Sequence, residues 1–404
     1  MSNIPKLRFP EFTDAWEKWE LNKIAIKVTE KNKDGIFQET LTNSAEFGVI
    51  SQRDFFDKDI SNPENLNGYY IVKPNDFVYN PRISNLAPVG PIKRNQLNRI
   101  GVMSPLYFIF RVSSNIDLDF LDAFFSTNLW HLFMKLNGDS GARADRIAIK
   151  DKIFMEMPIS LPTLPEQQKI GNLFKQLDRL ITLHKRKWDD VILLKKALLQ
   201  KMFPKNGADF PEIRFPEFTD AWEKCKLGEV AEMYSGGTPN AKNKQYYGGN
   251  IPFIRSAEIN SDKTELFLTE EGLALSAAKM VDIGDILYAL YGATSGEVGI
   301  SKIKGAINQA VLAIIPHKEK YDNYFISQWL KLNKDNITSF YLQGGQGNLS
   351  GNIVKELIIP FPTLPEQQKI GNLFKQLDRL ITLHKRQHEH YQLLKKALLQ
   401  QMFV

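Results

Sequence analysis

The residue groupings in this chain that could carry out catalysis each lack an essential member. The stretch 292–297 (GATSGE) has the glycines of a phosphate-binding loop but not the lysine that would reach a phosphate. His388 and His390 flank a glutamate, but on a helix two positions of separation turn the side chains about 200° apart, so they cannot easily share a metal ion. Asn80-Pro81-Arg82 lacks the second proline and the aromatic residue of the Asn-Pro-Pro-aromatic element of amino-methyltransferases. We therefore predict a chain that binds rather than reacts, with no catalytic residue and no metal site.

Two glycine-rich loops remain as candidates for binding an anion. They lie at residues 236–237 and 344–347. Backbone N–H groups in such loops can surround a phosphate. The same glycines can equally serve only to turn the chain, and the sequence leaves both interpretations open.

Length and composition indicate a folded intracellular protein. The 404 residues correspond to two or three domains of ordinary size, and a hydrophobic content of 43%, with 26 Phe and 13 Tyr, is sufficient for real cores. The single cysteine, Cys225, excludes a disulfide framework and a cysteine-based zinc or iron–sulfur site, and it fits a reducing compartment. No signal peptide is visible, and no apolar run is long enough to cross a bilayer. We expect a soluble cytoplasmic protein with no membrane partner.

The chain repeats itself, so it consists of two units of about 200 residues. Each unit has a short motif, a variable region and a long segment with a basic excess. Recent duplication could preserve such identity without a function for every position, but chance cannot produce it. The identical stretches are Arg8–Lys18 with Arg214–Lys224, Pro162–Arg186 with Pro362–Arg386, and Leu193–Gln200 with Leu393–Gln400.

The positive charge is concentrated in the two long segments. Residues 165–204 contain nine Lys or Arg and four Asp or Glu, and residues 365–404 contain seven and three. The two segments therefore carry charges of +5 and +4, whereas the formal net charge of the whole chain is +6. Lys185–Lys187 and Lys195-Lys196 could face DNA or an acidic protein, or they could form a solvated helix face.

Both long segments are predicted to be helices. Thr163 and Glu166 fit a capping box, and Pro204 with Gly207 marks the end of the first helix. Apolar residues recur at spacings of three and four from Ile170 onward, which is typical of a coiled-coil seam. From residue 165 to 203 the helix would be about 58 Å long. Each helix has an apolar face that needs a partner, and the simplest partner is its own repeat in an antiparallel pair.

The variable regions, at about 19–160 and 225–360, differ in sequence but share a plan. In each, a turn precedes an apolar strand, a second strand follows a glycine, and a helical pattern leads through a glycine-rich loop and a strand into the long helix. We read the same α+β domain twice. The corresponding segments are 72–79 with 281–288, 107–111 with 310–315, 120–136 with 324–332, and 137–141 with 343–347.

The order of these features resembles the specificity subunit of type I restriction–modification systems. The residues that carry the resemblance are the duplicated Leu-Pro-Thr-Leu-Pro-Glu-Gln-Gln-Lys-Ile helix start, with a variant first residue in the second copy, together with Gly236-Gly237-Thr238-Pro239 and Asn308-Gln309. The first domain has no counterpart of the Gly-Gly-Thr-Pro element. The resemblance implies an α+β fold with pseudo-two-fold symmetry. In it, target-recognition domains at 1–161 and 207–361 would be joined by long antiparallel coiled-coil helices at 162–206 and 362–404.

The same resemblance implies a function. Each target-recognition domain would read one half of a split, asymmetric site on double-stranded DNA, while the helices fix the spacing. Two methyltransferase subunits would dock on the chain and methylate adenine at N6, and motor–nuclease subunits would join them. S-adenosylmethionine, ATP and Mg are expected on those partner subunits, and no cofactor is expected on this chain.

Polar residues in loops between apolar strands are the predicted DNA contacts. Arginine can hold guanine by two hydrogen bonds, and asparagine or glutamine can do the same for adenine. The alternatives for each residue are a phosphate contact that positions the protein or an ordinary solvated loop. The candidates are Asn80, Arg82, Ser84, Asn85, Arg143 and Arg146 in the first domain, and Tyr291, Thr294, Ser295, Gln309, Gln343, Gln346 and Asn348 in the second.

The repeated motif Arg8–Lys18, with Phe9, Phe12 and Trp16, has two interpretations. It can attach the start of each domain to the long helices, or it can dock a partner. Two other functions for the whole chain also remain at this point. One is a structural adaptor that binds two proteins and no DNA, and the other is a free-standing DNA-modifying enzyme, for which the sequence offers no motif.

Overall fold

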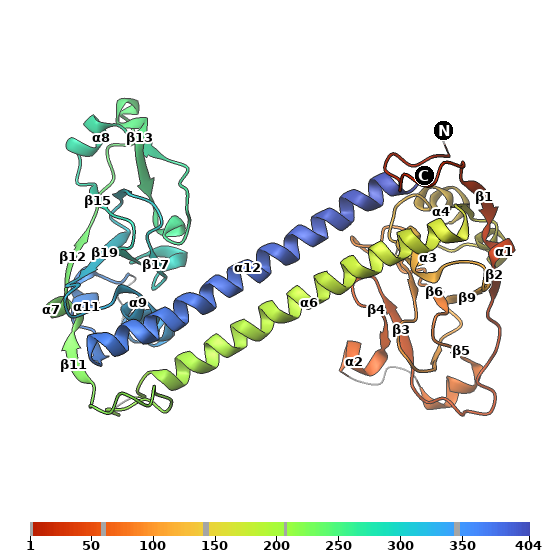
Figure 1. The fold of residues 1–404 in the computed structure, drawn as a ribbon, viewed down its shortest axis with the longest axis horizontal. Helices are drawn as coiled ribbons and strands as arrows, with labels where there is room; N and C mark the ends of the chain where they lie inside the picture. The colour runs from red at the N-terminus through yellow and green to blue at the C-terminus, as the bar shows by residue number, and fades with distance from the viewer. Residues whose placement is uncertain (1–2, 58–61, 140–144, 206–207, 343–347) are drawn as a thin grey trace. The chain divides into compact units, whose positions relative to one another are not determined.

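The computed structural model describes residues 3–57, 62–139, 145–205, 208–342 and 348–404. The chain forms two compact units. Unit 1 contains Met1–His184 and Arg386–Val404, and unit 2 contains Lys185–Lys385. The long helices α6 (Leu164–Met202) and α12 (Leu364–Met402) therefore each begin in one unit and end in the other (Figure 1).

Unit 1 begins with a short strand and alternates strands with short helices before α6. In order, its elements are β1 (Glu17–Glu20), α1 (Leu21–Ile24), β2 (Ala25–Lys27), β3 (Leu41–Ser44), β4 (Gly48–Ser51), α2 (Gln52–Phe56), η1 (Pro63–Gly68), β5 (Tyr70–Val72), β6 (Phe77–Tyr79), β7 (Ile92–Arg94), β8 (Gly101–Met103), β9 (Phe108–Val112), α3 (Leu118–Phe125), α4 (His131–Asn137), α5 (Asp151–Met155) and β10 (Pro158–Leu161).

Unit 2 follows the end of α6 with a similar succession. Its elements are β11 (Glu223–Lys226), α7 (Leu227–Val230), β12 (Ala231–Ser235), η2 (Lys244–Tyr246), β13 (Tyr247–Ile254), η3 (Ser256–Glu258), β14 (Phe267–Leu268), α8 (Glu270–Ala274), β15 (Lys279–Val281), β16 (Ile286–Ala289), η4 (Gly292–Thr294), β17 (Val298–Ile300), β18 (Gly305–Ile307), β19 (Val311–Pro316), α9 (Asn323–Leu332), α10 (Lys334–Leu342), α11 (Gly351–Lys355) and β20 (Ile358–Phe361).

The two units share one frame. A four-stranded antiparallel sheet has the order β2-β9-β6-β7 in unit 1 and β12-β19-β16-β17 in unit 2, which are corresponding strands of the two repeats. In both units the first strand pairs with the strand that enters the long helix, with Glu17 opposite Leu161 and Glu223 opposite Phe361. The predicted plan of one α+β domain present twice is therefore confirmed.

The units differ in what is inserted into this frame. Between β2 and β5, unit 1 has the hairpin β3-β4 and helix α2. Between β12 and β15, unit 2 has the longer strand β13, which pairs with β14 and runs parallel to β18. The parts of the two units that differ in sequence are thus inserted into sheets with the same strand order.

The repeated helix start attaches each domain to its helix. In unit 1 the side-chain oxygen of Gln167 accepts from Asp117 N (3.0 Å), and Gln367 does the same for Asp322 in unit 2. Gly171 must be glycine because an added Cβ would lie 2.3 Å from Asp117 Oδ1. The identity of these positions in both copies therefore has a structural cause.

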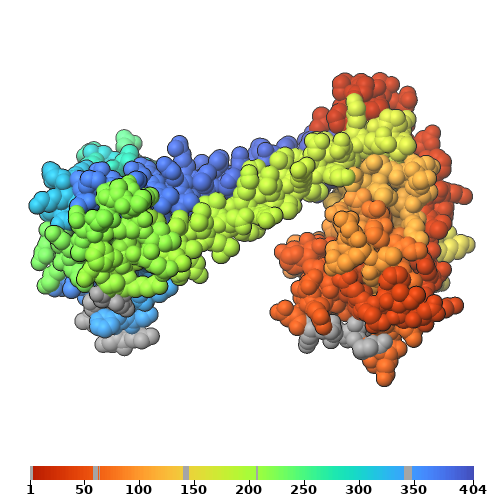
Figure 2. Space-filling view, turned by 60° about the horizontal axis from the view of Figure 1, so that its bottom comes forward, coloured from red at the N-terminus to blue at the C-terminus, as the bar shows by residue number. Residues whose placement is uncertain are grey.

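The repeated N-terminal motif is fixed by a buried ion pair. Arg8 Nε lies 2.7 Å from Glu166 Oε1, and Arg214 repeats this contact with Glu366 at the same distance. Both oxygens of Glu166 accept from Arg8, so the carboxylate predicted to close a capping box serves a tertiary contact. In the space-filling view the N-terminal segment (red) lies over the start of α6 (Figure 2). The prediction that the motif attaches each domain to the helices is confirmed.

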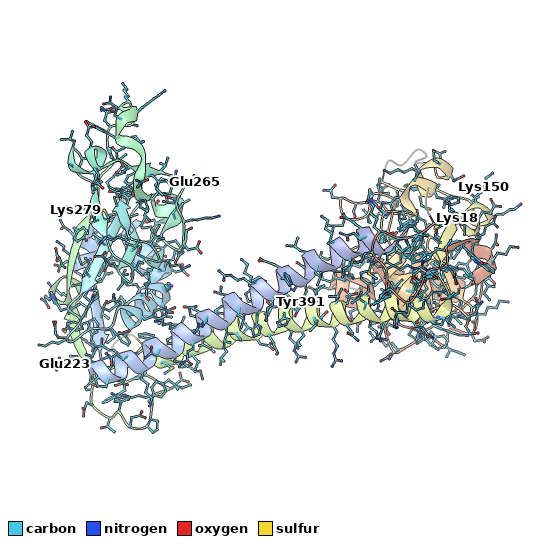
Figure 3. The ribbon with its side chains drawn as sticks, turned by 45° about the horizontal axis from the view of Figure 1, so that its top comes forward. Lys18, Lys150, Glu223, Glu265, Lys279 and Tyr391 are labelled. Carbon is cyan, nitrogen blue, oxygen red and sulfur yellow. The ribbon has the colours of Figure 1, made fainter. Side chains whose placement is uncertain are left out.

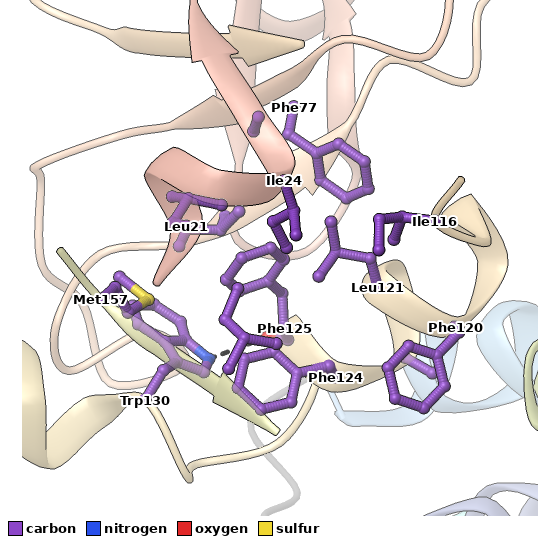
Figure 4. Packing of buried hydrophobic residues seen from close by; sticks show 14 of the residues in the cluster. Leu21, Ile24, Phe77, Ile116, Phe120, Leu121, Phe124, Phe125, Trp130 and Met157 are labelled. Carbon is purple, nitrogen blue, oxygen red and sulfur yellow. Dashed lines mark hydrogen bonds between the residues drawn. The ribbon is translucent and has the colours of Figure 1, made fainter. Parts of the chain in front are cut away.

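Each hydrophobic core is completed by the end of the helix that arrives from the other unit. In unit 1, Phe403 contacts Trp16, with ring centroids 6.1 Å apart, and in unit 2 Phe203 contacts Trp222 at the same separation. Figure 4 shows part of the first core, in which the indole N–H of Trp130 donates to Phe125 O (3.2 Å). Burying a large apolar side chain contributes about 1.5–3 kcal/mol, so these helix ends help to hold each unit together.

The long helices pair antiparallel within each unit, as predicted. In unit 1, Tyr391, which is labelled in Figure 3, stacks on His184 with ring centroids 5.6 Å apart, and Asp178 pairs with Lys395 (2.5 Å). Residue numbers rise on α6 while they fall on α12. Unit 2 repeats the arrangement with Lys195 and Asp378 (2.6 Å).

The prediction of one helix over residues 120–136 is wrong in one respect, because this segment forms two helices. Helix α3 ends at Phe125, and α4 begins at His131. The hydroxyls of Ser126 and Thr127 donate to the carbonyls of Asp122 and Phe124 (3.0 and 2.7 Å). Such local bonds compete with helical ones and end the helix. In unit 2 the corresponding helix α9 spans Asn323–Leu332, close to the predicted range.

Candidate nucleic-acid interface

In unit 1 the predicted contact loop follows strand β6. The side chain of Asn80 bridges two backbone segments, because its Nδ2 donates to Asn43 O (2.8 Å) and its Oδ1 accepts from Arg82 N (3.0 Å). Ser84 Oγ accepts from Ala87 N (3.2 Å). Asn80 and Ser84 therefore shape the loop, whereas the neighbouring Asn85 is exposed and available for a partner.

Two arginines that are far apart in sequence lie side by side in this unit. Arg82 and Arg146 form an isolated antiparallel bridge. The guanidinium of Arg82 is exposed and lies 3.9 Å from Asp145. Arg146 is half-buried, and among the residues that the structure describes its Nε has no hydrogen-bond partner. The third predicted arginine, Arg143, lies outside the described residues.

A cavity of about 480 Å³ joins these residues to a part of the chain that the sequence analysis did not select. Asn80, Arg82, Ser84 and Arg146 line it together with residues of β3, the β3–β4 turn and α2. Asn43 on β3 is only 1% exposed and donates to Val78 O and Pro91 O (2.7 and 3.1 Å). The structure thus gathers four of the six first-domain candidates around one cavity.

In unit 2 the Gly-Gly-Thr-Pro element lies against the loop that contains Gln309. An added Cβ on Gly236 would lie 1.8 Å from Ile307 O, and one on Gly237 would lie 2.5 Å from the Cβ of Ala277. The glycines therefore allow close packing of backbone on backbone. This contact accounts for both glycines without a bound phosphate.

The consequence of that close packing is a fixed position for Gln309. Thr238 Oγ1 donates to Gln309 Oε1 (2.5 Å), and the hydroxyl of Tyr291 donates to the carbonyl oxygen of Gln309 (2.6 Å). The side chain of Gln309 is exposed, and its amide N–H groups are left to donate to a partner. Such a preorganised donor fits the O6 and N7 acceptors of guanine or the N7 of adenine.

The remaining described candidates of unit 2 adjoin this site. Ser295 Oγ donates to Leu290 O (3.1 Å), so it shapes the loop that also contains the half-buried Thr294. Leu349 N donates to the same carbonyl (3.1 Å), which brings the exposed Asn348 next to this loop. Gln343 and Gln346, with the glycines between them, lie outside the described residues.

The basic residues of the long helices are partly neutralised within the molecule. Lys195 pairs with Asp378, which also accepts from the hydroxyl of Tyr324 (2.7 Å). Burial lowers the pKa of the neighbouring Lys331, and the charge of Asp378 opposes this shift. Lys185 pairs with Asp189 on its own helix (2.6 Å). Part of the basic excess therefore stabilises the helices and is not free for a partner.

Neither a metal-binding cluster nor a membrane-spanning helix is present in the part of the chain that the structure describes. In that part, no group of three or more histidine, cysteine or carboxylate side chains is arranged to hold a metal ion. No described helix is both long enough and apolar enough to span a membrane.

The chain is similar to known proteins in both sequence and structure. A family model described as the type I restriction modification DNA specificity domain matches the chain twice, over residues 15–194 and 219–390. The putative type I restriction enzyme MjaX specificity subunit of Methanocaldococcus jannaschii is 28% identical over 252 residues, which cover 60% of this chain and 57% of the relative. The MjaVIII specificity subunit of the same organism is 25% identical over 319 residues, covering 75% and 73%. The chain thus spans little more than half the length of the first relative.

Solved structures agree with this result at the level of the fold. The type I restriction–modification S subunit from M. genitalium matches with a TM-score of 0.66 and 15% identity, covering 99% of each chain. A chain from a study of complex assembly and conformational transition of a type I system matches with a TM-score of 0.50 and 16% identity, covering 96% of this chain and 97% of the other.

The doubled frame, the paired helices and the two family matches together define a chain with two DNA-specificity domains. The chain belongs to the type I restriction–modification specificity subunit family, because the matched residues make up most of its length. The family assignment suggested by the repeated helix start and the Gly-Gly-Thr-Pro element is confirmed.

Proposed function

We propose that this chain is the non-catalytic, DNA-reading subunit of a type I restriction–modification complex, and that each unit reads one half of an asymmetric bipartite site. The observation that carries the proposal is one frame that occurs twice with different loops on it. Different side chains meet different base edges, so two unlike sets of loops imply two unlike half-sites. A symmetric site would require two similar sets.

The long helices are proposed to set the distance between the half-sites. Each has 39 residues, so it is about 58 Å long, which corresponds to at most about 17 base pairs at 3.4 Å per pair. Base pairs between the half-sites would go unread.

Docking of two methyltransferase subunits is supported by exposed leucines that occur twice, and we propose that each set forms a docking surface. Leu193 in unit 2 and its repeat Leu393 in unit 1 are 63% and 68% exposed, and both lie on the long helices. Leu383 and Leu183, which are also repeats of each other, are exposed on the facing helix of the same units. Exposed apolar groups of this kind mark interaction surfaces. Because the surface occurs twice, it fits two copies of one partner.

The chemistry is assigned to the partners. A methyltransferase subunit would hold S-adenosylmethionine and flip the target adenine out of the duplex for methylation at N6. Motor–nuclease subunits would hold ATP and Mg. This chain would contribute the sequence preference and hold none of these cofactors.

The proposal is tested by selecting duplexes from a random library with the chain bound to its methyltransferase. The expected result is a split motif with two different halves and an unread gap. Equal binding of all duplexes would favour a structural adaptor. Methylation by this chain alone, when it is given S-adenosylmethionine, would favour a free-standing enzyme.

The docking surface is tested with matched variants. Leu193→Glu and Leu393→Glu are each expected to remove one methyltransferase from the complex, and the double variant both, as measured by the mass of the complex in solution. Leu136→Glu, at an exposed position on α4 rather than on a long helix, is the control. Two bound methyltransferases in the double variant would exclude this surface.

A further inference from the structure

Unit 1 carries a group of exposed apolar side chains around one cavity. Phe47 lies in the β3–β4 turn and is 60% exposed, and its ring contacts Phe55 of α2 with centroids 6.2 Å apart. Phe55 in turn contacts Phe56 (4.6 Å). Leu86 and Leu106, which are 72% and 61% exposed, come from two other loops. All five line the cavity of about 480 Å³, and we call them the apolar rim.

The apolar rim surrounds polar groups that lack full partners. Arg82 and Arg146 line the same cavity, and among the described residues of its lining the one carboxylate is that of Glu46. Nε of Arg82 lies 3.9 Å from Oδ2 of Asp145, which is a long ion-pair distance, and Nε of Arg146 has no hydrogen-bond partner among the described residues. An exposed apolar patch marks an interaction site, and guanidinium groups beside it favour a partner that offers acceptors or negative charge.

Duplex DNA offers this combination in its major groove. Thymine is the one base that carries a methyl group there, and guanine presents O6 and N7 to arginine. Phenylalanine and other apolar side chains contact thymine methyl groups in protein–DNA complexes. A protein partner would satisfy an apolar patch as well, but it would not explain why the rim shares a cavity with the loop that follows β6.

We propose that the apolar rim reads one or more thymine methyl groups in the half-site bound by unit 1. Phe47, Leu86 and Leu106 contact the methyl groups, while Arg82 and Arg146 hold the adjacent guanine or phosphate oxygens. This inference rests on the proposed DNA-reading function and adds a base preference to it. The candidate contacts of unit 2 centre on the polar Thr238–Gln309 pair, so we expect the preference in the half-site of unit 1.

The test replaces thymine by deoxyuridine, which removes the methyl group and leaves the base-pairing edge unchanged. The chain is used in complex with its methyltransferase, after the half-site of unit 1 has been assigned. At least one replacement in that half-site is expected to weaken binding about fourfold, the equivalent of about 0.8 kcal/mol for one methyl group. Replacements in the other half-site are expected to have no comparable effect.

Variants connect the effect to the apolar rim. Phe47→Ala and Leu86→Ala are expected to bind thymine and deoxyuridine duplexes about equally. Leu136→Ala is the matched control, because Leu136 is 74% exposed in the same unit and does not line the cavity. Unchanged binding of unit 2's half-site by each variant shows that the complex is intact.

Several outcomes would overturn the inference. They are a unit 1 half-site without thymine, deoxyuridine replacements without effect, and equal behaviour of Leu86→Ala and Leu136→Ala. Loss of methyltransferase binding by Leu86→Ala, with the thymine preference retained, would make the rim a protein-docking surface and also overturn it. In each of these cases a split motif would still support the proposed function, whereas binding without any sequence preference would refute that function itself.

Discussion

Lengthening both long helices together is expected to lengthen the unread gap and leave both half-sites unchanged. Insertion points can be chosen so that the contacts between the two helices survive in each unit. In unit 1, His184 stacks on Tyr391, and in unit 2, Lys385 lies over the ring of Trp188. Seven residues inserted after position 186, and seven after position 386, fall between these contacts on both helices.

The magnitude follows from helix geometry. Seven residues add about 10.5 Å at 1.5 Å per residue, and they turn the helix to within about 20° of two full turns, so the apolar faces stay nearly aligned. At 3.4 Å per base pair the gap can grow by up to about three pairs. An insertion of four residues in each helix would add about 6 Å, or at most about two pairs, but it would rotate the faces by about 40° more than a full turn.

The assay maps methylated adenines in cells that contain the variant and its methyltransferase. We expect both half-sites to stay the same while the gap increases. Circular dichroism of the purified variant shows whether the helices have remained intact. A gap of unchanged length with full activity would refute the role of α6 and α12 in spacing.

Three further predictions follow from particular contacts. Gln309→Ala is expected to relax the preference at one base pair of the unit 2 half-site, with a loss of about 1–3 kcal/mol of discrimination between bases, and Thr238→Val to do so more weakly. Library selection measures the preference, and a changed preference in the other half-site would contradict the assignment. Arg8→Ala leaves Glu166 buried without its cation, and Arg214→Ala does the same to Glu366. We expect each variant to lower the free energy of unfolding by about 3–5 kcal/mol in denaturant titrations. A loss below about 1 kcal/mol would be inconsistent with the buried pair. Joining the two chain ends and opening the segment after α6 is expected to give a folded, active circular permutant. The reason is that Leu7 N donates to Gln401 O at the end of α12 (2.9 Å), just as Ile213 N donates to Lys201 O at the end of α6 (2.8 Å). Failure to bind DNA would count against the equivalence of the two units.

The architecture was predictable because its signals are periodic or repeated. The spacing of apolar residues predicted a helix from about residue 165 to 203, and α6 spans Leu164–Met202. Duplicated motifs predicted two related units, and the common sheet order confirms them. Local sequence patterns gave the wrong role where a side chain bonds to a residue far away in the sequence. Glu166 reads as a capping residue, yet its carboxylate is held by Arg8, which is 158 positions away.

The candidate sites were predictable only in part. Polar loops between strands could be selected, and the structure gathers four of the selected residues around one cavity. The contact between Thr238 and Gln309 joins residues 71 positions apart, so no local pattern reveals it, although both belong to the elements that carry the resemblance to the family. Exposed aromatic residues such as Phe47 were missed because an isolated phenylalanine in a sequence reads as a core residue.

Exchanging residues 19–160 for the corresponding residues of another family member tests the central claim most directly. The chain is expressed with its methyltransferase, and the methylated adenines are mapped across the genome before and after the exchange. If each unit reads its own half-site, one half of the motif changes, while the other half and the gap stay the same. A change in both halves, or in neither, would contradict two independent readers on one repeated frame.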